Sequence, residues 1–508
     1  MPLTVLSDED VRSLLHSLTR KDVLEIQQAL ADALHYYSTA IEDEDNGCNA
    51  GYQPTRTHLK RQDGSTTLFM PASSNEGMGV KIVTLSEVCA NAAKPPPPRI
   101  GSLESVSPSP STGSSSSKLG RASLSSMKDA LNMSSTDSNT KSNPSSARSS
   151  LDMTNMSEEP YTYKPHKPSR HSSTTPFDVP PDITPEMREM KGASTSPSGS
   201  LTLLNNDGTV RGLINAAEIT AFRTALASTM LFKKRSNVHN VTIFGGGKQA
   251  YWHARLSLLL RGPEIHHLNF VNRSFENVVS LLHDLYKIHW PVEIQHPNTT
   301  IITPMHTEYQ RHLKSTIRAS NVIFCTTPST EPLFPPEYLT STEGRKKGRY
   351  IAAVGSYAPH MIEIHTDIIK QAVAPGHKHH HHKHAKQGGA IVVDSVEACL
   401  KEAGELIQAG LVGNEVVELG ELVMLKREAE SRRKESNTSL DDEGVELGLS
   451  GRKKNGKEKE EDGGLKDWLE KGNVIYKSVG LGLMDVVVGT ELVRLADAMG
   501  VGTRVAKF

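Results

Sequence analysis

The sequence predicts an α/β protein built on a parallel sheet that binds a dinucleotide. A short apolar run ending at Phe244 leads into three glycines and a helix-compatible stretch that begins near Lys248. Later apolar runs alternate with helical segments, the pattern of a parallel sheet covered by helices. Two of these runs end in polar loops, at Cys325–Ser329 and Ala353–Ser356. Such strand ends border ligand sites in open α/β folds, so we expect these loops to lie beside a nicotinamide ring.

The glycine turn has the spacing Gly-x-Gly-x-x-Ala, on Gly245, Gly247 and Ala250. The first glycine allows a sharp turn, the second allows a pyrophosphate to approach the backbone, and the alanine lets the helix pack closely on the strand. The phosphates would then lie on the amides at the helix N-terminus. The same spacing also fits a glycine-rich turn that binds nothing, so the following strand has to support the interpretation.

That following strand, predicted over Ile265 to Val271, ends in Asn272, Arg273 and Ser274. An NAD-binding unit has an acidic residue here, about 20 residues after the glycines, to hold the ribose 2′-hydroxyl. An arginine instead suits a 2′-phosphate, because guanidinium is a planar, permanently charged fork for phosphate oxygens. NADP(H) is therefore the expected cofactor and NAD(H) the second possibility. The competing interpretation of Arg273 is a solvated loop residue.

Composition restricts the class of protein. A chain of 508 residues is long enough for more than one domain, and a net charge of −1 with 5% aromatic residues gives no support for nucleic-acid binding. No apolar run reaches roughly 18 residues and the N-terminus lacks a signal pattern, so we expect neither membrane insertion nor secretion. The cysteines, Cys48, Cys89, Cys325 and Cys399, form no C-x-x-C pair. We expect buried thiols in the reducing cytoplasm.

The N-terminal part predicts a small mixed layer. Leu3–Leu6 is a strand candidate, and Ser7 and Thr19 can cap two helices that extend through Leu15 and Tyr37. Short strand-like segments follow around Arg56, at Thr67–Met70 and at Gly79–Leu85. Arg56 and Lys81 are cations inside these segments, and the default explanation for each is a side chain on the solvent face.

A Ser- and Pro-rich stretch from about 91 to 199 is predicted to be a disordered insertion. It interrupts a sheet, because Ser200–Leu204 and Val210–Ile214 flank a turn-forming Asn-Asn-Asp-Gly and predict a hairpin. An amphipathic helix is expected over Ile219–Lys234, with Arg223 off its apolar face.

In the second half, further strands are expected at Ile301–Ile302, Asn321–Thr326 and Tyr350–Val354. Insertions are expected at about 375–388, which is rich in histidine, and at about 426–464, which is charged. The histidines have no carboxylate or cysteine partner, so we expect no defined metal site. Order returns with Val474–Asp485, followed by a last helix over Val487–Met499.

Taken together, several separated segments resemble the ornithine cyclodeaminase and mu-crystallin family. They span nearly the whole chain outside the insertions and occur in the family's order: LTVLSDEDVRSLL, QPTR around Arg56, GVKIVTL around Lys81, DGTVRGLINAAEITAFRTALAS around Arg223, GGGKQAYWHA, NRS, TTPSTEPLF, VGSYAPHMIE, VDSVEACLKEAGEL and YKSVGLGLMD.

The resemblance implies a homodimer whose subunit has a Rossmann-type doubly wound parallel sheet inserted in a second α/β domain, which binds substrate and forms the dimer. Residues 1–90, 200–236 and 486–508 would form the substrate domain, and residues 237–485 the NADP-binding domain. Arg56, Lys81 and Arg223 would hold the carboxylate of a small amino or imino acid, with Lys81 also able to donate a proton towards the imine nitrogen. The expected cofactor-binding residues are Gly245, Gly247, Lys248, Gln249, Ala250, Asn272, Arg273, Ser274, Thr326, Thr327, Pro328, Val354, Gly355 and Ser478.

One motif departs from the family. Its cyclodeaminases carry Gly-Asp-x-Pro-Gly-Lys, and here Tyr357 and Met361 occupy the aspartate and lysine positions. A phenol is too weak a base near neutral pH to replace the carboxylate. The sequence therefore predicts an NADPH-dependent reductase of a small imino acid, or the reverse amino acid dehydrogenase. The alternatives are a cyclodeaminase-type lyase with bound NAD and an NADPH-bound ligand-binding or regulatory protein with little turnover.

Overall fold

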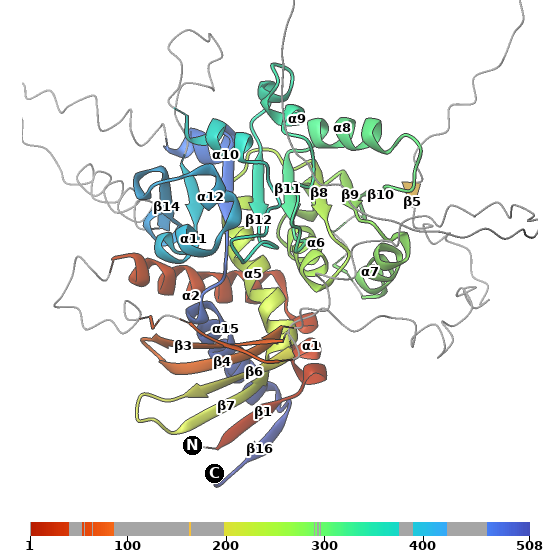
Figure 1. Ribbon diagram of the computed structural model, residues 1–508. Coiled ribbons are helices and arrows are strands. Elements are labelled where there is room, and N and C mark those ends of the chain that lie inside the picture. The colour runs from red at the N-terminus through yellow and green to blue at the C-terminus, as the bar shows by residue number, and fades with distance from the viewer. Residues whose placement is uncertain are drawn as a thin grey trace, which may run out of the picture. The chain divides into compact units, whose positions relative to one another are not determined.

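The computed structural model describes residues 2–39, 53–54, 56–62, 65–85, 162–163, 198–288, 290–291, 294, 296–374, 390–423 and 465–508. Backbone contacts divide the chain into two units, and all the described residues belong to the unit made of Met1–Asn91 and Pro160–Phe508. The described residues form two sheets with their helices (Figure 1). The histidine-rich tract, the charged insertion and most of the Ser- and Pro-rich insertion lie outside the described residues.

The first sheet has seven strands in the order β16-β1-β7-β6-β4-β3-β2. β1 and β7 are parallel, and the other neighbours are antiparallel. β4 pairs with β6, so the sheet continues across the insertion as expected, with Lys81 opposite Leu201. The strands are β1 Leu3–Leu6, β2 Thr57–Lys60, β3 Thr66–Ser74, β4 Gly77–Leu85, β6 Ser198–Leu204, β7 Val210–Asn215 and β16 Thr503–Val505.

Four long helices pack on one side of this sheet: α1 Asp8–Ser17, α2 Arg20–Thr39, α5 Ala216–Phe232 and α15 Gly482–Met499 (Figure 1). The predicted caps are confirmed, because Ser7 forms a capping box with Asp10 and the Thr19 amide donates to Asp22. Two predicted helix starts were wrong. α5 begins at residue 216, where the Asn215 side chain caps the Ala217 amide, and α15 begins five residues before Val487.

The second sheet has nine strands in the order β14-β13-β15-β12-β11-β8-β9-β10-β5, all parallel except β5. β5 (Thr162–Tyr163) lies inside the segment expected to be disordered and pairs with β10. The other strands are β8 Asn240–Phe244, β9 His267–Val271, β10 Asn298–Ile302, β11 Val322–Cys325, β12 Tyr350–Ala353, β13 Ile391–Val393, β14 Val416–Glu418 and β15 Val474–Lys477.

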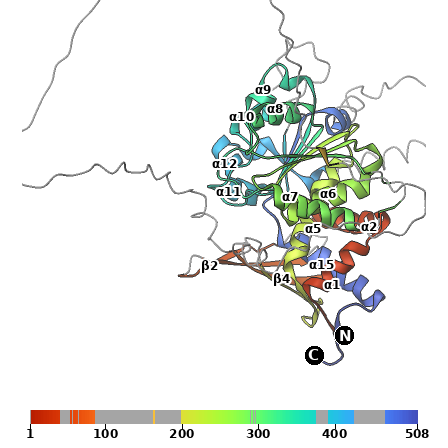
Figure 2. The ribbon, with the colours of Figure 1, turned by 90° about the vertical axis from the view of Figure 1, so that its right-hand side faces the viewer.

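Helices cover both faces of this sheet, as the doubly wound fold requires (Figure 2). Val322 and Phe324 of β11 join the core shared with α5, α6 and α7, whereas Ile323 and Cys325 join the core shared with α8 and α10. Alternate residues of one strand thus enter opposite cores. The helices are α6 Lys248–Arg261, α7 Phe275–Lys287, α8 Tyr309–Ala319, α9 Glu337–Thr340, α10 Thr366–Val373, α11 Val396–Glu402 and α12 Gly404–Ala409.

Helix α5 connects the two sheets. Phe222 on α5 makes an edge contact with Trp252 on α6, and the Tyr350 hydroxyl at the start of β12 donates to the Ser228 carbonyl at 2.6 Å. The core that contains the four long helices therefore continues to one face of the second sheet. This packing places the loop that follows β15 beside a helix of the first sheet, because Gly480 in that loop lies next to the Arg223 guanidinium on α5.

The cysteines and the apolar character of the helices were also the subject of expectations from the sequence. Cys325 and Cys399 are buried free thiols, as expected, and Cys48 and Cys89 lie outside the described residues. Among the helices that the structure describes, none combines the length and apolar character needed to cross a bilayer.

Candidate functional site

The glycine turn has the geometry of a phosphate-binding turn. Gly245 has φ +125°, and a Cβ there would lie 2.6 Å from Thr326 Oγ1, so only glycine fits. A Cβ on Gly247 would meet no atom within 4 Å, and no side chain caps the helix that Gly247 begins. The first amides of α6 therefore have no capping partner and border open space, which fits a dinucleotide pyrophosphate. The buried Gln249 Oε1 beside them has no hydrogen-bond partner among the described residues.

The loop after β9 lies against this turn. A Cβ on Gly246 would lie 2.9 Å from Asn272 Nδ2, and Asn272 Nδ2 donates to the Ser274 carbonyl at 2.8 Å. Ser274 caps α7 by accepting from the Asn277 amide. Arg273 between them is exposed and contacts no charged group among the described residues. The structure thus brings all three predicted residues beside the glycine turn and leaves the Arg273 guanidinium available.

Lys248 has a different partner from the one expected. Its ammonium lies 3.0 Å from Glu218 Oε1 on α5 and 3.7 Å from Asp8 Oδ1 on α1. Glu218 also accepts from Trp252 Nε1, so the carboxylate that holds Lys248 is itself fixed. The Lys248 side chain thus joins α6 to the first sheet's helices, and its contact with a cofactor stays a prediction.

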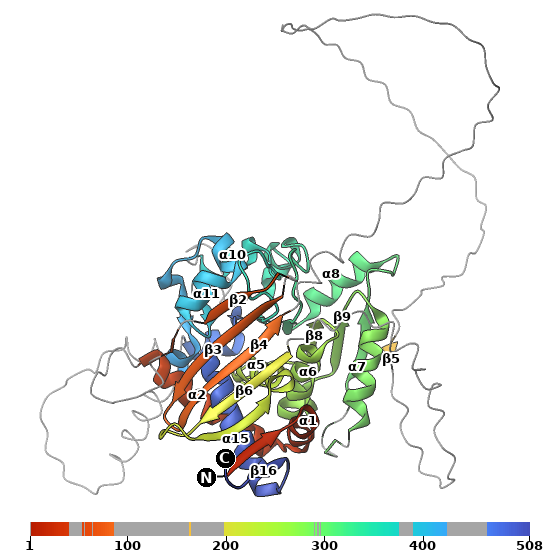
Figure 3. The ribbon, with the colours of Figure 1, turned by 60° about the horizontal axis from the view of Figure 1, so that its bottom comes forward.

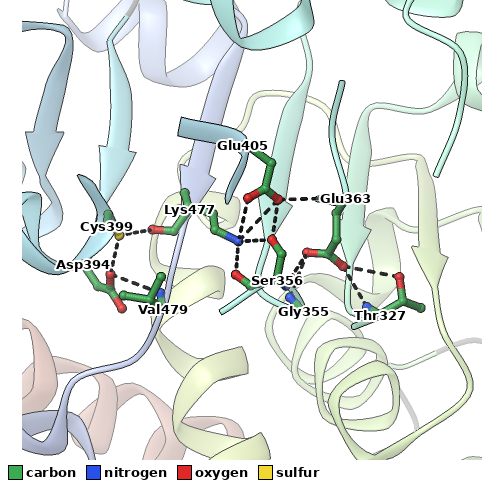
Figure 4. A network of polar contacts seen from close by, with 9 residues as sticks. All are labelled: Thr327, Gly355, Ser356, Glu363, Asp394, Cys399, Glu405, Lys477 and Val479. Carbon is green, nitrogen blue, oxygen red and sulfur yellow. Dashed lines mark hydrogen bonds and ion pairs between the residues drawn. The ribbon is translucent and has the colours of Figure 1, made fainter. Parts of the chain in front are cut away.

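The loops after β11, β12 and β15 lie at the carboxyl ends of parallel strands, the edge of the sheet where we expect the cofactor and which we call the cofactor edge. Thr326 Oγ1 donates to the Phe244 carbonyl at 2.6 Å, and Ser478 Oγ donates to Asp394 Oδ2 at 2.7 Å. The amides of Thr327 and Gly355 both donate to the buried Glu363 carboxylate (Figure 4). Pro328 is exposed and Val354 is buried. We expected Thr327 and Gly355 to contact a cofactor, but their amides already have internal partners, so only their remaining atoms can do so.

The predicted carboxylate-binding cations come together in the first sheet. Lys81 Nζ on β4 lies 2.9 Å from Asp485 Oδ1 on α15, and Arg223 Nε on α5 lies 3.3 Å from the same oxygen. Lys81 is 2% exposed and Arg223 5% exposed. Lys81 thus points to the face that the helices cover, against the default of a solvent-facing cation that the family resemblance had already replaced.

Arg56 precedes β2 and forms an ion pair with Glu402 at the end of α11. Burial lowers the pKa of Lys81 to about 8; the Asp485 carboxylate opposes this shift, and the positive charges of Arg223 and Arg56 add to it. The three predicted cations thus share one electrostatic environment. If all five side chains are charged, these three cations and the carboxylates of Glu402 and Asp485 leave one uncompensated positive charge, which suits a single substrate carboxylate.

A hollow opens between Arg56 and the loop after β15. Its lining includes Tyr37, Gln53, Arg56, Met70, Glu402 and Gly480. Met70 is the cross-strand partner of Lys81, and a Cβ on Gly480 would lie 2.6 Å from Arg223 Nη2. The cation cluster therefore borders this hollow.

Asp394 joins the cation cluster to the cofactor edge. It follows β13 and accepts from Ser478 Oγ and from the Gly480 amide, both at 2.7 Å. Ser478 is a predicted cofactor-binding residue and Gly480 lies next to the Arg223 guanidinium, so one short loop joins the two predicted sites.

Three acidic residues of this region, Asp394, Glu363 and Asp485, were not predicted from the sequence. Asp485 is completely buried, and its Oδ2 has no hydrogen-bond partner among the described residues. The available signal was an acid inside the apolar stretch from Gly482 to Val488, because a buried acid is rare without a charged partner.

Comparisons with known proteins agree with this architecture. Residues 188–418 match the model of the ornithine cyclodeaminase/mu-crystallin family. The uncharacterized protein YGL159W of Saccharomyces cerevisiae is 31% identical over 243 residues, a match that spans 43% of this chain and 61% of the yeast protein, less than two thirds of its length. A Δ1-pyrroline-2-carboxylate reductase of Bacillus cereus is 25% identical over 302 residues, which cover 58% of this chain and 69% of the bacterial one.

Among solved structures, the Thermococcus litoralis Δ1-pyrroline-2-carboxylate reductase in complex with NADH and L-proline superposes with a TM-score of 0.55. The alignment covers 99% of both chains at 15% identity, a likeness that establishes the shared fold. The match of residues 188–418 to this family model agrees with the resemblance that the separated sequence segments predicted.

Proposed function

We propose that this protein reduces the C=N bond of a small imino acid with a nicotinamide cofactor, or runs the reverse amino acid dehydrogenase reaction. The observation that carries the proposal is the convergence of Lys81 and Arg223 on Asp485, next to the loop that also supplies the cofactor edge. The names of the Bacillus cereus reductase and of the Thermococcus litoralis complex with NADH and L-proline support it. Residues 1–90, 200–236 and 486–508 are the proposed substrate and dimer domain, and residues 237–485 the cofactor domain.

In this proposal, some side chains of the cation cluster orient the substrate and one transfers a proton. Arg56 and Arg223 hold the substrate carboxylate, since guanidinium forms bidentate contacts with carboxylates. Lys81 donates the proton to the imine nitrogen, and Asp485 keeps the lysine charged and oriented. The bound cofactor supplies the hydride. The protein contributes mainly by aligning the hydride donor with the imine carbon, so that the two react as if they were parts of one molecule.

Glu402 shows that a carboxylate can reach Arg56. Its ion pair with Arg56 is the contact that a substrate carboxylate would replace or share. Burial raises the pKa of Glu402, and the adjacent Arg56 charge opposes this shift. A substrate carboxylate would compete with Glu402 for the Arg56 guanidinium.

NADP(H) is the proposed cofactor, with NAD(H) as the second possibility. Arg273 is exposed beside the glycine turn and is free of ion pairs within the described ranges. The acidic Glu276 in the first turn of α7 accepts from Ser274 Oγ, and so is held within this loop. Arg273→Asp should shift the ratio of kcat/KM values from NADPH towards NADH. An unchanged ratio would remove Arg273 as the source of the preference.

A homodimer is the proposed assembly, and the outer face of the first sheet is its proposed interface. Figure 3 shows β3, β4, β6 and β7 with their helices behind them. The residues that alternate with buried ones on this face include Phe69, Val80, Ile82 and Leu213, and Leu213 is 38% exposed. An apolar sheet face of this kind marks an interface. Ile82→Asp should convert a dimer to a monomer in sedimentation velocity, and a wild-type monomer would contradict the proposal.

A cytoplasmic location is also proposed. The support is that the two described cysteines, Cys325 and Cys399, are buried thiols, as expected in a reducing compartment. Fractionation of cells that express the full chain tests this, and recovery with an organelle would contradict it.

The reductase proposal is tested by NADPH and NADH oxidation with Δ1-pyrroline-2-carboxylate and Δ1-piperideine-2-carboxylate. We expect one cofactor to be oxidised per amino acid formed, and Arg223→Gln to raise KM for the imino acid. Arg504→Gln is the matched control, because Arg504 is a half-exposed arginine paired with Asp497. Ammonia release from a diamino acid without net oxidation would indicate the lyase. Tight NADPH binding without turnover of any imino acid would indicate the binding protein.

A further inference from the structure

A buried polar network lies beneath the proposed nicotinamide end of the second sheet (Figure 4). Glu363 Oε1 accepts from the Thr327 amide at 2.7 Å, and Glu363 Oε2 accepts from the amides of Gly355 and Ser356 at 2.8 and 3.3 Å. Thr327 follows β11, and Gly355 and Ser356 follow its parallel neighbour β12. One carboxylate therefore joins the two loops that leave adjacent strands.

These loops are in direct backbone contact. A Cβ on Gly355 would lie 2.2 Å from the Thr327 carbonyl oxygen, so no other residue fits without movement. The preceding Thr326 donates to the Phe244 carbonyl and fills the space beside Gly245. A displacement at Glu363 would thus pass through Thr327 and Thr326 to the glycine turn.

A second layer holds Glu363 in place. Glu405 Oε1 on α12 accepts from the Glu363 amide at 3.1 Å and from Ser356 Oγ. Lys477 at the end of β15 donates to the Ser356 carbonyl at 2.5 Å and lies 3.4 Å from Glu405. Glu363 and Glu405 are both 0% exposed and Lys477 is 1% exposed. Burial of two carboxylates with one ammonium is costly, and the mechanism proposed above uses none of the three.

We propose that Glu363, held by Glu405 and Lys477, is a positioning residue that fixes the two loops at the nicotinamide before the cofactor binds. At the carboxyl edge of an open α/β sheet, free amides normally face a ligand. Here an internal carboxylate binds them, so the loops are ordered in advance. The expected change in kcat rests on the proposed reductase function, whereas the expected change in loop order rests on the network alone.

The protonation state of Glu363 should affect how firmly the two loops are held. Burial raises the pKa of Glu363 to about 7, with Lys477 opposing the shift and Glu405 adding to it. Cys325 on β11 is the other titratable group that interacts with it, and burial raises the pKa of this thiol, so it stays neutral. Because this pKa lies above that of a solvated glutamate, the buried arrangement binds the proton more tightly than an opened one would. The loops should therefore open more readily as the pH rises through about 7 and the buried carboxyl ionises.

The test compares Glu363→Gln with Glu337→Gln, an exposed glutamate on α9, in the full chain. The glutamine side chain introduced by Glu363→Gln keeps the size of the glutamate but turns a donor towards backbone N–H groups. Hydrogen exchange of the protein without cofactor should rise in peptides that contain residues 326–329 and 354–357, with other peptides and the thermal midpoint little changed. In steady-state assays, kcat should fall about 10- to 100-fold at similar KM for the imino acid, as expected of misalignment. The wild-type kcat should show a titration near pH 7 that the variant lacks.

The outcomes separate the two proposals. Local loosening without wild-type turnover of any imino acid would support the network's role and reject the reductase. Wild-type turnover with unchanged loop exchange and an unchanged pH profile in Glu363→Gln would reject the positioning role alone. Exchange that rises throughout the protein would also overturn it, because Glu363 would then be a general stability residue. Lys477→Met is the second variant and should give the same local loosening.

Discussion

Replacement of Asp485 by asparagine probes the pairing at the centre of the cation cluster. Asp485 is fully buried, and one of its oxygens contacts both Lys81 and Arg223. Asparagine keeps the shape and removes the charge, which leaves two buried cations without a counter-ion. Loss of one partner from a buried ion pair typically costs about 3–5 kcal/mol.

The two cations should respond differently. Lys81 has a pKa of about 8, so at pH 7.5 it can lose its proton for about 0.7 kcal/mol, at about 1.36 kcal/mol per pKa unit. Arg223 cannot deprotonate and stays charged. We therefore expect a loss of about 4 kcal/mol in unfolding free energy, carried mainly by Arg223. The pKa of Lys81 should also fall further, since Asp485 is the group that raises it.

Two assays check this prediction. Urea unfolding followed by intrinsic fluorescence measures stability, and Asp497→Asn is the control because its ion pair with Arg504 is half-exposed and should contribute less than about 1 kcal/mol. The pH dependence of kcat/KM measures the lysine, and the basic limb of Asp485→Asn should move below that of the wild type. A variant within about 1 kcal/mol of the wild type, with an unmoved limb, would refute the account of the cluster.

Three further predictions concern protonation and backbone shape. Apart from the titration of Glu363 near pH 7, kcat/KM for the imino acid should stay constant below pH 8 and fall above it as Lys81 deprotonates, and persistence of this basic limb in Lys81→Met would contradict the assignment. Gly247→Ala should weaken cofactor binding in titrations of nicotinamide fluorescence without loss of stability. Gly245→Ala should cost about 1–3 kcal/mol in urea unfolding, because of its φ and the nearby Thr326, and equal stability of the two glycine variants would contradict this. Burial lowers the pKa of His253 to about 4, so the unfolded chain binds more protons between about pH 6.5 and 4. As the pH falls from about 6.5 to 4, the free energy of unfolding should therefore decrease by up to about 3 kcal/mol. His253→Gln should make this decrease smaller in urea unfolding titrations.

Local signals in the sequence identified most elements of the fold. The caps at Ser7 and Thr19 depend on side chains three residues apart, and the glycine turn depends on a six-residue spacing, so both are visible in a single sequence. The start of α15 was misjudged because Gly480 and Gly482 resemble a loop. In the fold, however, Gly482 packs close to the carbonyl of Met70 and begins the helix.

The candidate site was predictable only in part, because its contacts join distant segments. The meeting of Lys81 and Arg223 at Asp485 spans 404 residues between the lysine and the aspartate, and the sequence segments pointed to the cations but not to their counter-ion. Lys248 was assigned to the cofactor from its place after the glycines, yet Glu218 on another helix holds its side chain. Glu363 carried no local signal, because its partners are backbone amides of loops brought together by strand pairing.

Transfer of deuterium from NADPH labelled at the reactive nicotinamide C4 position tests the central proposal most directly. The purified protein would be incubated with labelled NADPH and Δ1-pyrroline-2-carboxylate, and the proline formed would be analysed by mass spectrometry and NMR. The account predicts one deuterium at Cα for each NADPH oxidised, and a large loss of this product with Arg223→Gln. Proline without deuterium at Cα, or no proline despite bound NADPH, would contradict a reductase that aligns hydride donor and imine.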